Sequence, residues 1–153
     1  MHWQLNSQSY VTTDPQQLDR EVVFNYLHDI AYWSKGIPRE ICMTSLDHSI
    51  PFSVIHQQQQ IGFGRLVTDE CTFAYLGDVF VLDAYQGHGF GTFLVSCIND
   101  WLDQHRIRTA LLLTSDAQSL YAAQGWVHPS DVRRFMRYKE PVADFYGSFS
   151  SEE

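Results

Sequence analysis

The segment Gln86-Gly87-His88-Gly89-Phe90-Gly91 constrains the fold of this chain more than any other. It follows an apolar run, Phe73 to Leu82, whose valines and aromatic residues are typical of a buried strand. It leads into a segment from Phe90 to Leu102 that has apolar residues at helical spacing. A glycine-rich turn at a helix N-terminus can bind an anion, because unpaired backbone N–H groups and the helix dipole meet there. Without this context the alternating glycines would indicate only a tight turn.

Two other families of phosphate-binding turn do not fit. A P-loop has Lys and then Ser or Thr after its last glycine, whereas Gly91 is followed by Thr92 and Phe93. A dinucleotide-binding turn has the pattern Gly-x-Gly-x-x-Gly in a βαβ unit near the chain start. Here the glycines recur every second residue and the turn lies past the midpoint.

Hydrophobic periodicity and turn residues predict the remaining elements. We expect one domain, 1–153, with a polar tail from about residue 147 and no linker. The expected elements are a strand at 9–13, a helix from Asp14 to about Asp29, a helix from Pro38 to about Asp47, strands at 51–56, 61–68 and 73–82, a helix at 90–102, a strand at 109–114, a helix at 117–124, and a final hairpin that joins 126–127 to 134–138.

The pattern Gln86-x-x-Gly89-x-Gly91 resembles the pyrophosphate-binding turn of the GNAT N-acetyltransferases, the Gcn5-related, acetyl-CoA-dependent family. The predicted order β-α-α-β-β-β-α-β-α-β-β also resembles the GNAT fold, an α/β fold with a mixed sheet and helices on both faces. The resemblance covers nearly the whole chain and is strongest from Thr72 to Tyr138. Two short segments, 32–38 and 63–69, resemble a bacterial subgroup of poorly characterised GNAT proteins.

The composition excludes several classes of protein. A formal net charge of −8 argues against a nucleic-acid partner and mildly favours cationic substrates. We expect neither a signal peptide nor a membrane span, because the first residues lack a basic region before an apolar segment and no apolar run approaches eighteen residues. The scattered cysteines Cys42, Cys71 and Cys97 indicate reduced thiols in the cytoplasm. The seven histidines show no spacing typical of a metal site, and no Gly-x-Ser-x-Gly nucleophile motif is present.

The GNAT resemblance implies that acetyl-CoA is the cofactor, with no metal. It places the pantetheine arm and thioester on main-chain groups of Phe80, Val81 and Leu82. It places the pyrophosphate at the turn, with Gln86 at the first motif position and backbone N–H groups of Gly87, His88, Gly89, Phe90, Gly91 and Thr92. The His88 side chain could touch phosphate or remain a solvated loop residue. Many relatives carry Asn at the position of Thr114, which could replace one of the hydrogen bonds of that Asn to the pantetheine.

Tyr121 is the best candidate for a catalytic side chain. The run Leu120-Tyr121-x-x-x-Gly125-Trp126 resembles the family pattern in which a tyrosine hydroxyl protonates the departing sulfur of coenzyme A. A phenol keeps its proton at neutral pH, which suits a general acid. The alternative is a tyrosine that only packs in the core.

The general base is less defined. Polyamine-type relatives have a glutamate at the position of Gly77, so the adjacent Asp78 is the candidate acid. A carboxylate in an apolar strand is costly unless it is paired or faces a cavity. Asp78 could receive the amine proton through water, anchor a cationic substrate, or hold a structural hydrogen bond. Asp116 is expected only to cap the helix that follows it.

Residues on the substrate side are expected near the first two helices and the third strand. Tyr32 and Trp33 could form an aromatic wall for an amine, although core packing is the commoner role for a residue such as Trp33. Arg65 could bind a substrate carboxylate or pair with Asp69 or Glu70.

The resulting hypothesis is an N-acetyltransferase that moves acetyl from acetyl-CoA to a small-molecule or peptide amine. A non-catalytic acyl-CoA-binding module on the same fold is the alternative, because a fold does not fix a function. A third alternative is a structural or partner-binding protein with a vacant site, but this reading would leave the glycine turn without a function. Family members commonly form homodimers.

Overall fold

A computed structural model describes residues 1–139 and 144–147. Its elements are β1 (His2–Asn6), β2 (Ser9–Thr12), α1 (Arg20–Asp29), α2 (Arg39–Asp47), β3 (Ile50–His56), β4 (Gln59–Thr68), β5 (Phe73–Val81), α3 (Phe90–Gln104), β6 (Thr109–Leu112) and α4 (Gln118–Ala123). Short 3-10 helices lie at Pro15–Gln17, Asp83–Tyr85 and Val132–Arg134.

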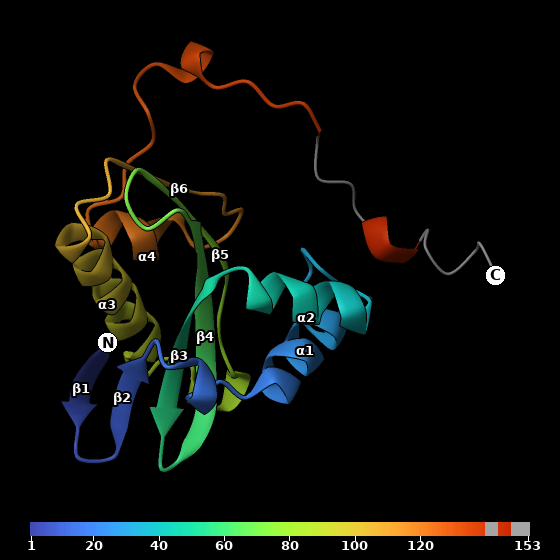
Figure 1. Ribbon diagram of the computed structural model, residues 1–153, viewed down its shortest axis with the longest axis vertical. Coiled ribbons are helices and arrows are strands. Elements are labelled where there is room, and N and C mark those ends of the chain that lie inside the picture. Colours follow the sequence, from blue (N-terminus) through green and yellow to red (C-terminus); the bar gives the residue numbers. More distant parts are fainter. Residues whose placement is uncertain (140–143, 148–153) are drawn as a thin grey trace.

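The six strands form one mixed sheet in the order β1-β2-β3-β4-β5-β6. Neighbours from β1 to β5 are antiparallel, and β5 and β6 are parallel. The parallel pair needs a crossover, which α3 provides. Figure 1 shows α1 and α2 on one side of the sheet and α3 with α4 on the other.

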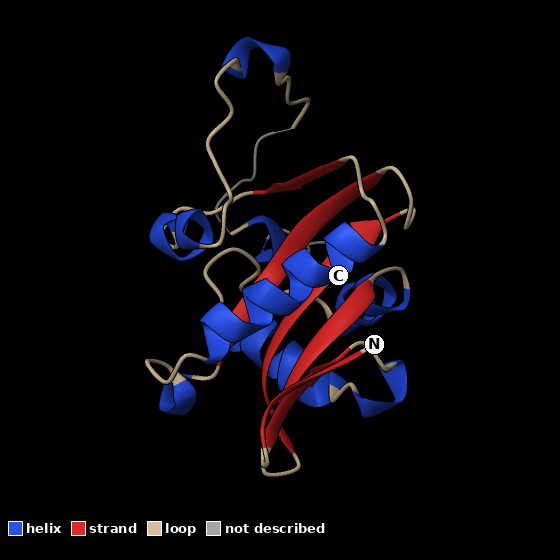
Figure 2. Ribbon diagram, turned by 90° about the vertical axis from the view of Figure 1, so that its left-hand side faces the viewer, coloured by secondary structure: helices blue, strands red, loops and turns tan. Residues whose placement is uncertain are grey.

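Each face of the sheet has its own apolar core. One core joins α3 to strand residues such as Phe52 and Leu66, which are fully buried. The other joins α1 and α2 to Phe63 and Phe80. Figure 2 looks onto the α3 face, and the strands cross behind that helix. The predicted mixed sheet with helices on both faces is confirmed.

The structure differs from the sequence-based expectation at the first helix. Helix α1 begins at Arg20, not at Asp14, because two aspartates compete to cap it. Asp14 accepts a hydrogen bond from the backbone N–H of Gln16 and starts only one 3-10 turn. Asp19 accepts from the N–H groups of Glu21 and Val22 and starts the α-helix.

Both ends of the sheet also differ from expectation. Strand β1 was not predicted, because its apolar residues Trp3 and Leu5 alternate over only five positions. The expected hairpin of 126–127 with 134–138 is absent from the described residues, where the chain beyond α4 has 3-10 turns and no strand. Trp126 instead turns inward, since its Nε1 donates to Asn99 Oδ1 at 2.9 Å.

Candidate active site

The strands β5 and β6, which are the last two strands of the sheet, part from each other partway along β5. They pair only from Phe73 to Leu76 on β5, although β5 continues to Val81. On its other side β5 stays paired with β4 as far as Val81. The main-chain groups of residues 77–81 that face away from β4 therefore have no strand partner in the described sheet. We call this unpaired stretch beside β5 the opening. Phe80 and Val81 lie in this stretch, and Leu82 follows it, where its N–H donates to Ile61 O at 2.8 Å.

A β-bulge lies at the point where the strands part. Phe63 pairs with Phe80 and Arg65 pairs with Gly77, so β5 has one residue more than β4 between these pairs. The extra length is accommodated at Asp78, whose φ of +54° is left-handed. Aspartate tolerates this conformation better than most residues do.

The glycine turn adjoins the open end of β5 and precedes α3. Gly87 and Gly89 have φ values of +78° and +86°, and an added Cβ on either would have no atom within 4 Å. Gly89 is the N-cap of α3 and supplies no side-chain cap. The first backbone bond of the helix runs from Phe93 N to Gly89 O, so the N–H groups from Phe90 to Thr92 have no helical partner.

Two side chains of the turn bend back onto the protein. Gln86 Nε2 donates to Val81 O at 2.9 Å and to Asp83 Oδ1 at 3.1 Å, which ties the turn to the end of β5. His88 Nδ1 lies 2.9 Å from Gln86 O. The turn is thus held by side chains while its outward N–H groups stay available.

Tyr121 lies on α4 and is buried, with 8% of its surface exposed. Its ring makes an edge contact with Trp126, at 6.2 Å between ring centroids. Within residues 1–139 and 144–147, its hydroxyl has no hydrogen-bond partner. Burial raises the pKa of Tyr121 to about 12, and the charge of Asp116 adds to this effect.

The turn, β5 and α4 converge at Gly91. A Cβ added there would lie 3.9 Å from Val81 Cγ2 and 4.0 Å from Leu120 Cδ2. The start of α3 therefore lies beside β5 and beside Leu120, the residue that precedes Tyr121 on α4.

Thr114 follows β6, and its Oγ1 accepts a hydrogen bond from Ala117 N at 3.0 Å. Asp116 was expected to cap this helix, but α4 has no side-chain cap from its own N-cap residue. The expectation for Asp116 is wrong because the threonine hydroxyl already holds the first turn.

Asp78 is at the centre of a hydrogen-bonded group beside the opening. Its Oδ2 accepts from Arg65 Nε at 2.7 Å, and its Oδ1 accepts from Trp33 Nε1 at 2.8 Å. The Arg65 and Asp78 side chains are only 18% and 13% exposed. Both carboxylate oxygens are thus engaged by protein donors.

The loop after α1 reaches both sides of the opening. Trp33 binds Asp78 on β5, while the neighbouring Tyr32 hydroxyl bonds to the Ser115 hydroxyl beyond β6. The two rings make an edge contact at 5.1 Å. Trp33 is 42% exposed, so the expectation that it packs in the core is wrong.

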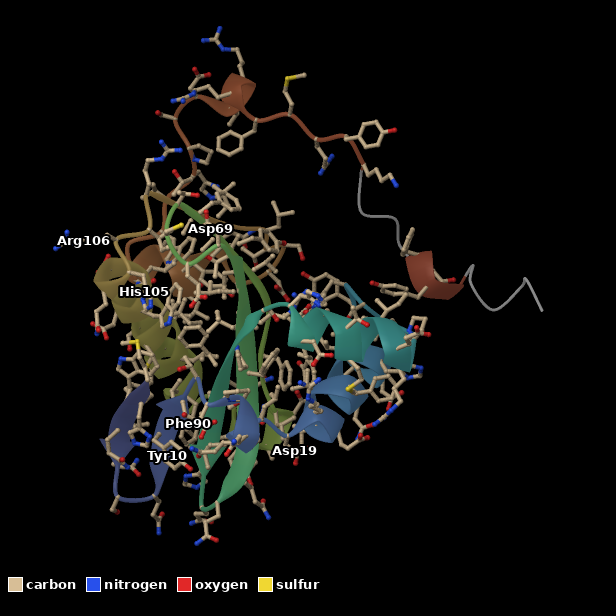
Figure 3. The ribbon with its side chains drawn as sticks, in the orientation of Figure 1. Tyr10, Asp19, Asp69, Phe90, His105 and Arg106 are labelled. Atoms are coloured by element: carbon tan, nitrogen blue, oxygen red, sulfur yellow. The ribbon has the colours of Figure 1, made fainter. Side chains whose placement is uncertain are left out.

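Asp69 lies apart from the other candidates. It accepts hydrogen bonds from the N–H groups of Cys71, Thr72 and Phe73 and from the Thr72 hydroxyl. These bonds hold its pKa well below the usual range. Figure 3 shows Asp69 near the upper part of the sheet and Phe90 well below it, because Asp69 precedes β5 and the glycine turn follows the other end of that strand.

Sequence reasoning missed two aromatic residues near the opening. Tyr75 lies over Gly77, since a Cβ at Gly77 would come within 3.2 Å of Tyr75 Cε1. Tyr26 on α1 stacks on Phe80 at 3.9 Å between ring centroids. The i, i+2 spacing of Tyr75 and Gly77 was a usable signal, because it puts both on one face of the strand.

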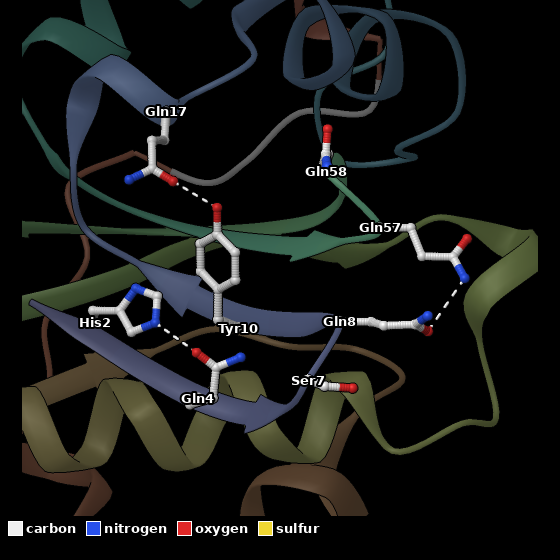
Figure 4. A pocket seen from close by; sticks show the side chains of 8 residues that line it. All are labelled: His2, Gln4, Ser7, Gln8, Tyr10, Gln17, Gln57 and Gln58. Atoms are coloured by element: carbon white, nitrogen blue, oxygen red, sulfur yellow. Dashed lines mark hydrogen bonds between the residues drawn. The ribbon is translucent and has the colours of Figure 1, made fainter.

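A hollow of the surface lies away from these candidates. It has a volume of about 610 Å³ and lies over the hairpin of β1 and β2, where none of the predicted site residues lines it. Figure 4 shows its polar lining, with Tyr10 donating to Gln17. The lining residues are His2, Gln4, Ser7, Gln8, Tyr10, Gln17, Gln57 and Gln58.

Across the described ranges, no group of three or more His, Cys, Asp or Glu side chains could hold a metal ion. In the same part of the chain, no helix is long and apolar enough to cross a membrane.

Comparisons with known proteins identify the class of this protein. The sequence profile of the acetyltransferase (GNAT) domain matches residues 47–128, which include the opening, the glycine turn and Tyr121. The crystal structure of an inferred GNAT-family acetyltransferase from Xanthomonas campestris pv. campestris is 34% identical, with a TM-score of 0.83, over 90% of this chain and 96% of that one. An inferred acetyltransferase of Gibberella zeae is 29% identical over 72% of this chain and 74% of that protein. The chain belongs to the GNAT acetyltransferase family.

A more distant structure has the same fold. AAC(6')-Iy in complex with the bisubstrate analogue CoA-S-monomethyl-acetylneamine is 16% identical, with a TM-score of 0.65, over 88% of this chain and 99% of that one.

Proposed function

We propose that this protein transfers an acetyl group from acetyl-CoA to a primary amine, by direct transfer in a ternary complex. The observation that carries the proposal is the position of Tyr121. It keeps its proton beside an opening in the sheet that adjoins an uncapped, glycine-rich helix N-terminus. The complex of AAC(6')-Iy with a CoA-based bisubstrate analogue supports the cofactor.

The residues of the turn suit a pyrophosphate group. Gly87 and Gly89 have no side chain that would block approach, and the free N–H groups at the start of α3 attract negative charge. We assign the pyrophosphate to the N–H groups of residues 87–92, with the His88 side chain at the edge. Main-chain groups of residues 80–82 and the half-buried Thr114 would hold the pantetheine arm.

Acetyl-CoA would supply the acetyl group as a thioester. The amine nitrogen forms a bond to the carbonyl carbon, and the carbon–sulfur bond breaks. Tyr121 gives its proton to the departing sulfur, and the proton that the amine loses returns to the phenol through water. Because burial keeps Tyr121 protonated, the acid is ready at neutral pH.

Asp78 is proposed to form the acceptor side of the site together with Arg65, Trp33 and Tyr32. The engagement of both Asp78 oxygens favours a role in positioning Trp33 and Arg65 over a role as a free base. Arg65 is neutralised by Asp78, so the wall offers aromatic surface to an amine without excess positive charge. For Asp69 we propose no contact with the substrate, because its carboxylate holds the turn between β4 and β5. Small-molecule and peptide amines both fit this description.

Tyr121→Phe tests the proposal. Loss of the hydroxyl removes only the proton donor, so turnover of a reactive amine should fall about a hundredfold or more. Stabilisation by acetyl-CoA in a thermal shift assay should persist. Tyr10→Phe is the matched control, because it removes a hydroxyl from a half-buried tyrosine on β2, whose partner is Gln17 and not a residue of the proposed site, and it should leave turnover nearly unchanged.

The outcomes separate three possibilities. Absence of stabilisation by acetyl-CoA would remove the cofactor assignment. Stabilisation without coenzyme A release across a panel of amines would favour the non-catalytic module, which the intact Tyr121 argues against. Equal turnover of wild type and Tyr121→Phe would exclude Tyr121 as the acid.

We also propose a cytoplasmic location, because Cys42, Cys71 and Cys97 are all unpaired thiols. Fractionation of cells with an antibody to the protein would test this, and recovery from an oxidising compartment would contradict it.

A further inference from the structure

Two aromatic residues flank the glycine turn. Tyr85 ends the short 3-10 helix before it, and Phe90 is the first residue of α3 after it. Their rings make an edge contact, with 6.5 Å between the ring centroids. Both rings pack into the core on the α3 side of the sheet, where Phe90 is 8% exposed. The two ends of the turn are thus joined through this core.

The half-buried side chain of His56, the last residue of β3, contacts both rings. Its ring centroid lies 5.8 Å from that of Tyr85 and 5.4 Å from that of Phe90. His56 precedes β4, so the contact brings together residues that two strands separate in the sequence. We call the three rings of His56, Tyr85 and Phe90 the aromatic base of the turn.

A buried hydroxyl fixes the orientation of the His56 ring. Its Nδ1 lies 2.7 Å from Ser9 Oγ, and Ser9 has 0% of its surface exposed. Ser9 and His56 face each other in the pairing of β2 with β3, so both residues of this hydrogen bond belong to the sheet. Rotation of the ring would take the partner from a hydroxyl that water does not reach, which is costly. The sheet therefore holds the ring against Tyr85 and Phe90.

The glycine turn depends on support at its two ends. Glycine restricts the backbone less than any other residue, and a Cβ added to Gly87 or Gly89 would have no atom within 4 Å. Gln86 ties the start of the turn to Val81 O. The other end depends on Phe90, because Gly89 supplies no side-chain cap to α3. N–H groups that are already in place bind an anion at a smaller cost in conformational entropy.

We propose that His56 is a positioning residue of the cofactor site. It holds Tyr85 and Phe90 so that the N–H groups of the glycine turn converge on the pyrophosphate of acetyl-CoA, and it acts through these two rings without touching the cofactor. The inference rests on the proposed function, because it takes the turn as the cofactor site. Loss of the His56 ring should weaken the binding of acetyl-CoA and leave the proton transfer from Tyr121 unchanged, since Tyr121 lies on α4.

Nuclear magnetic relaxation of the free protein tests the positioning itself. In His56→Ala the backbone order parameters of Gly87 and Gly89 should fall toward the value of about 0.6 that marks a flexible backbone. Unchanged order parameters in this variant would overturn the proposal, whether or not the protein binds acetyl-CoA.

His105→Ala is the matched control. This half-buried histidine also packs on an aromatic ring, that of Trp101 at 3.7 Å, and its Nδ1 lies 2.9 Å from Trp101 O. It lies at the opposite end of α3 from Phe90, as Figure 3 shows, so its loss should leave the order parameters of the turn unchanged. An equal fall in His56→Ala and His105→Ala would overturn the proposal, because it would indicate general loosening of the fold.

Kinetics and titration calorimetry test the consequence for the cofactor. His56→Ala should raise the Kd and the KM for acetyl-CoA about tenfold, while kcat stays within about twofold of the wild-type value. His56→Phe keeps the ring contacts and loses the bond to Ser9, so its affinity should lie between those of the wild type and His56→Ala. It also tests the proposal if His56→Ala does not fold, because its affinity should be lower than that of the wild type.

The outcomes separate this inference from the proposed function. A wild type that does not bind acetyl-CoA would overturn both. Full affinity in His56→Ala, a lower kcat with unchanged affinity, or weaker binding by His56→Phe than by His56→Ala would overturn the inference alone.

Discussion

Asp78 combines two unusual properties, a left-handed backbone and a nearly buried charge. The bulge in β5 turns its side chain toward Arg65 and Trp33, and the pairing offsets the cost of removing the carboxylate from water. A substitution at this residue therefore tests the electrostatics of the site if the backbone is preserved. Asparagine preserves it, because asparagine also adopts positive φ.

We predict that Asp78→Asn lowers the free energy of unfolding by about 3 kcal/mol, because it leaves the Arg65 charge without its counter-ion. Denaturation by urea measures the change. The control is Asp47→Asn, whose partner is Arg20 and whose pair is 37% and 57% exposed, so it should cost less than about 1 kcal/mol. If both variants lost the same free energy of unfolding, burial would not explain the strength of the Arg65–Asp78 pair.

A second prediction concerns the pH dependence of Tyr121. Burial raises its pKa to about 12 from the usual 10.0, so the unfolded chain loses this proton before the folded protein does. The resulting contribution to stability is complete below pH 10 and is lost as the pH rises toward 12. Turnover should therefore rise with pH as the amine deprotonates, without a fall below pH 10 that is due to Tyr121. A falling limb near pH 9 that Tyr121→Phe abolishes would contradict this.

At the scale of elements, the junction of β5, the glycine turn and α3 was predicted in place. The strand was expected to end at Leu82 and ends at Val81, and the helix begins at Phe90 as expected. This success has a physical reason, since a positive φ at Gly89 and the apolar periodicity after it are both local properties of the sequence.

We predict that Gly89→Ala weakens the binding of acetyl-CoA. A left-handed conformation costs an alanine about 1–2 kcal/mol, and the strained turn would move its N–H groups away from the cofactor. Gly36→Ala is the matched control, because Gly36 also has a positive φ of +75° and open space around it. Both variants should lose similar stability, but titration calorimetry should detect weaker binding only for Gly89→Ala. Equal affinities would exclude the turn from the cofactor site.

The elements that the sequence did not predict are those whose structure depends on distant partners. The late start of α1 follows from a choice between two aspartate caps, and Gln60 helps to decide it by accepting from the Asp19 N–H at 2.7 Å. The strand-like composition of 134–138 does not suffice to form a strand, because among the described residues this segment pairs with no other strand. A local sequence pattern does not show which of two caps a distant residue supports, and it does not show whether a partner strand is present.

For the molecule as a whole, the sequence predicted the elements that carry the proposed cofactor residues better than the contacts among the proposed acceptor residues. The cofactor candidates are consecutive in the chain, whereas Trp33 and Asp78 meet across 45 positions. The pairing of Arg65 with Asp78, and not with Asp69 or Glu70, depends on the bulge, which no composition signals.

The two faces of the sheet divide the thiols into two classes. Cys42 and Cys97 are buried in opposite cores, and burial raises the pKa of Cys97 to about 12. Cys71 is exposed in the turn between β4 and β5. We predict that one thiol of the folded protein reacts rapidly with Ellman's reagent and that three react in guanidinium. Rapid reaction of more than one thiol in the folded state would contradict the packing of the cores.

The strand order has a consequence for how the chain folds. Strands β3, β4 and β5 are joined by short turns and can pair early, because loops of this length close at little entropic cost. The pairing of β6 with β5 must wait for α3, which makes this junction a late event. Pulse-labelled hydrogen exchange during refolding should protect the amides of β4 before those of β6, and the reverse order would refute this sequence of events. Since the proposed cofactor site lies at the same junction, a chain that has not finished folding would be unable to hold acetyl-CoA.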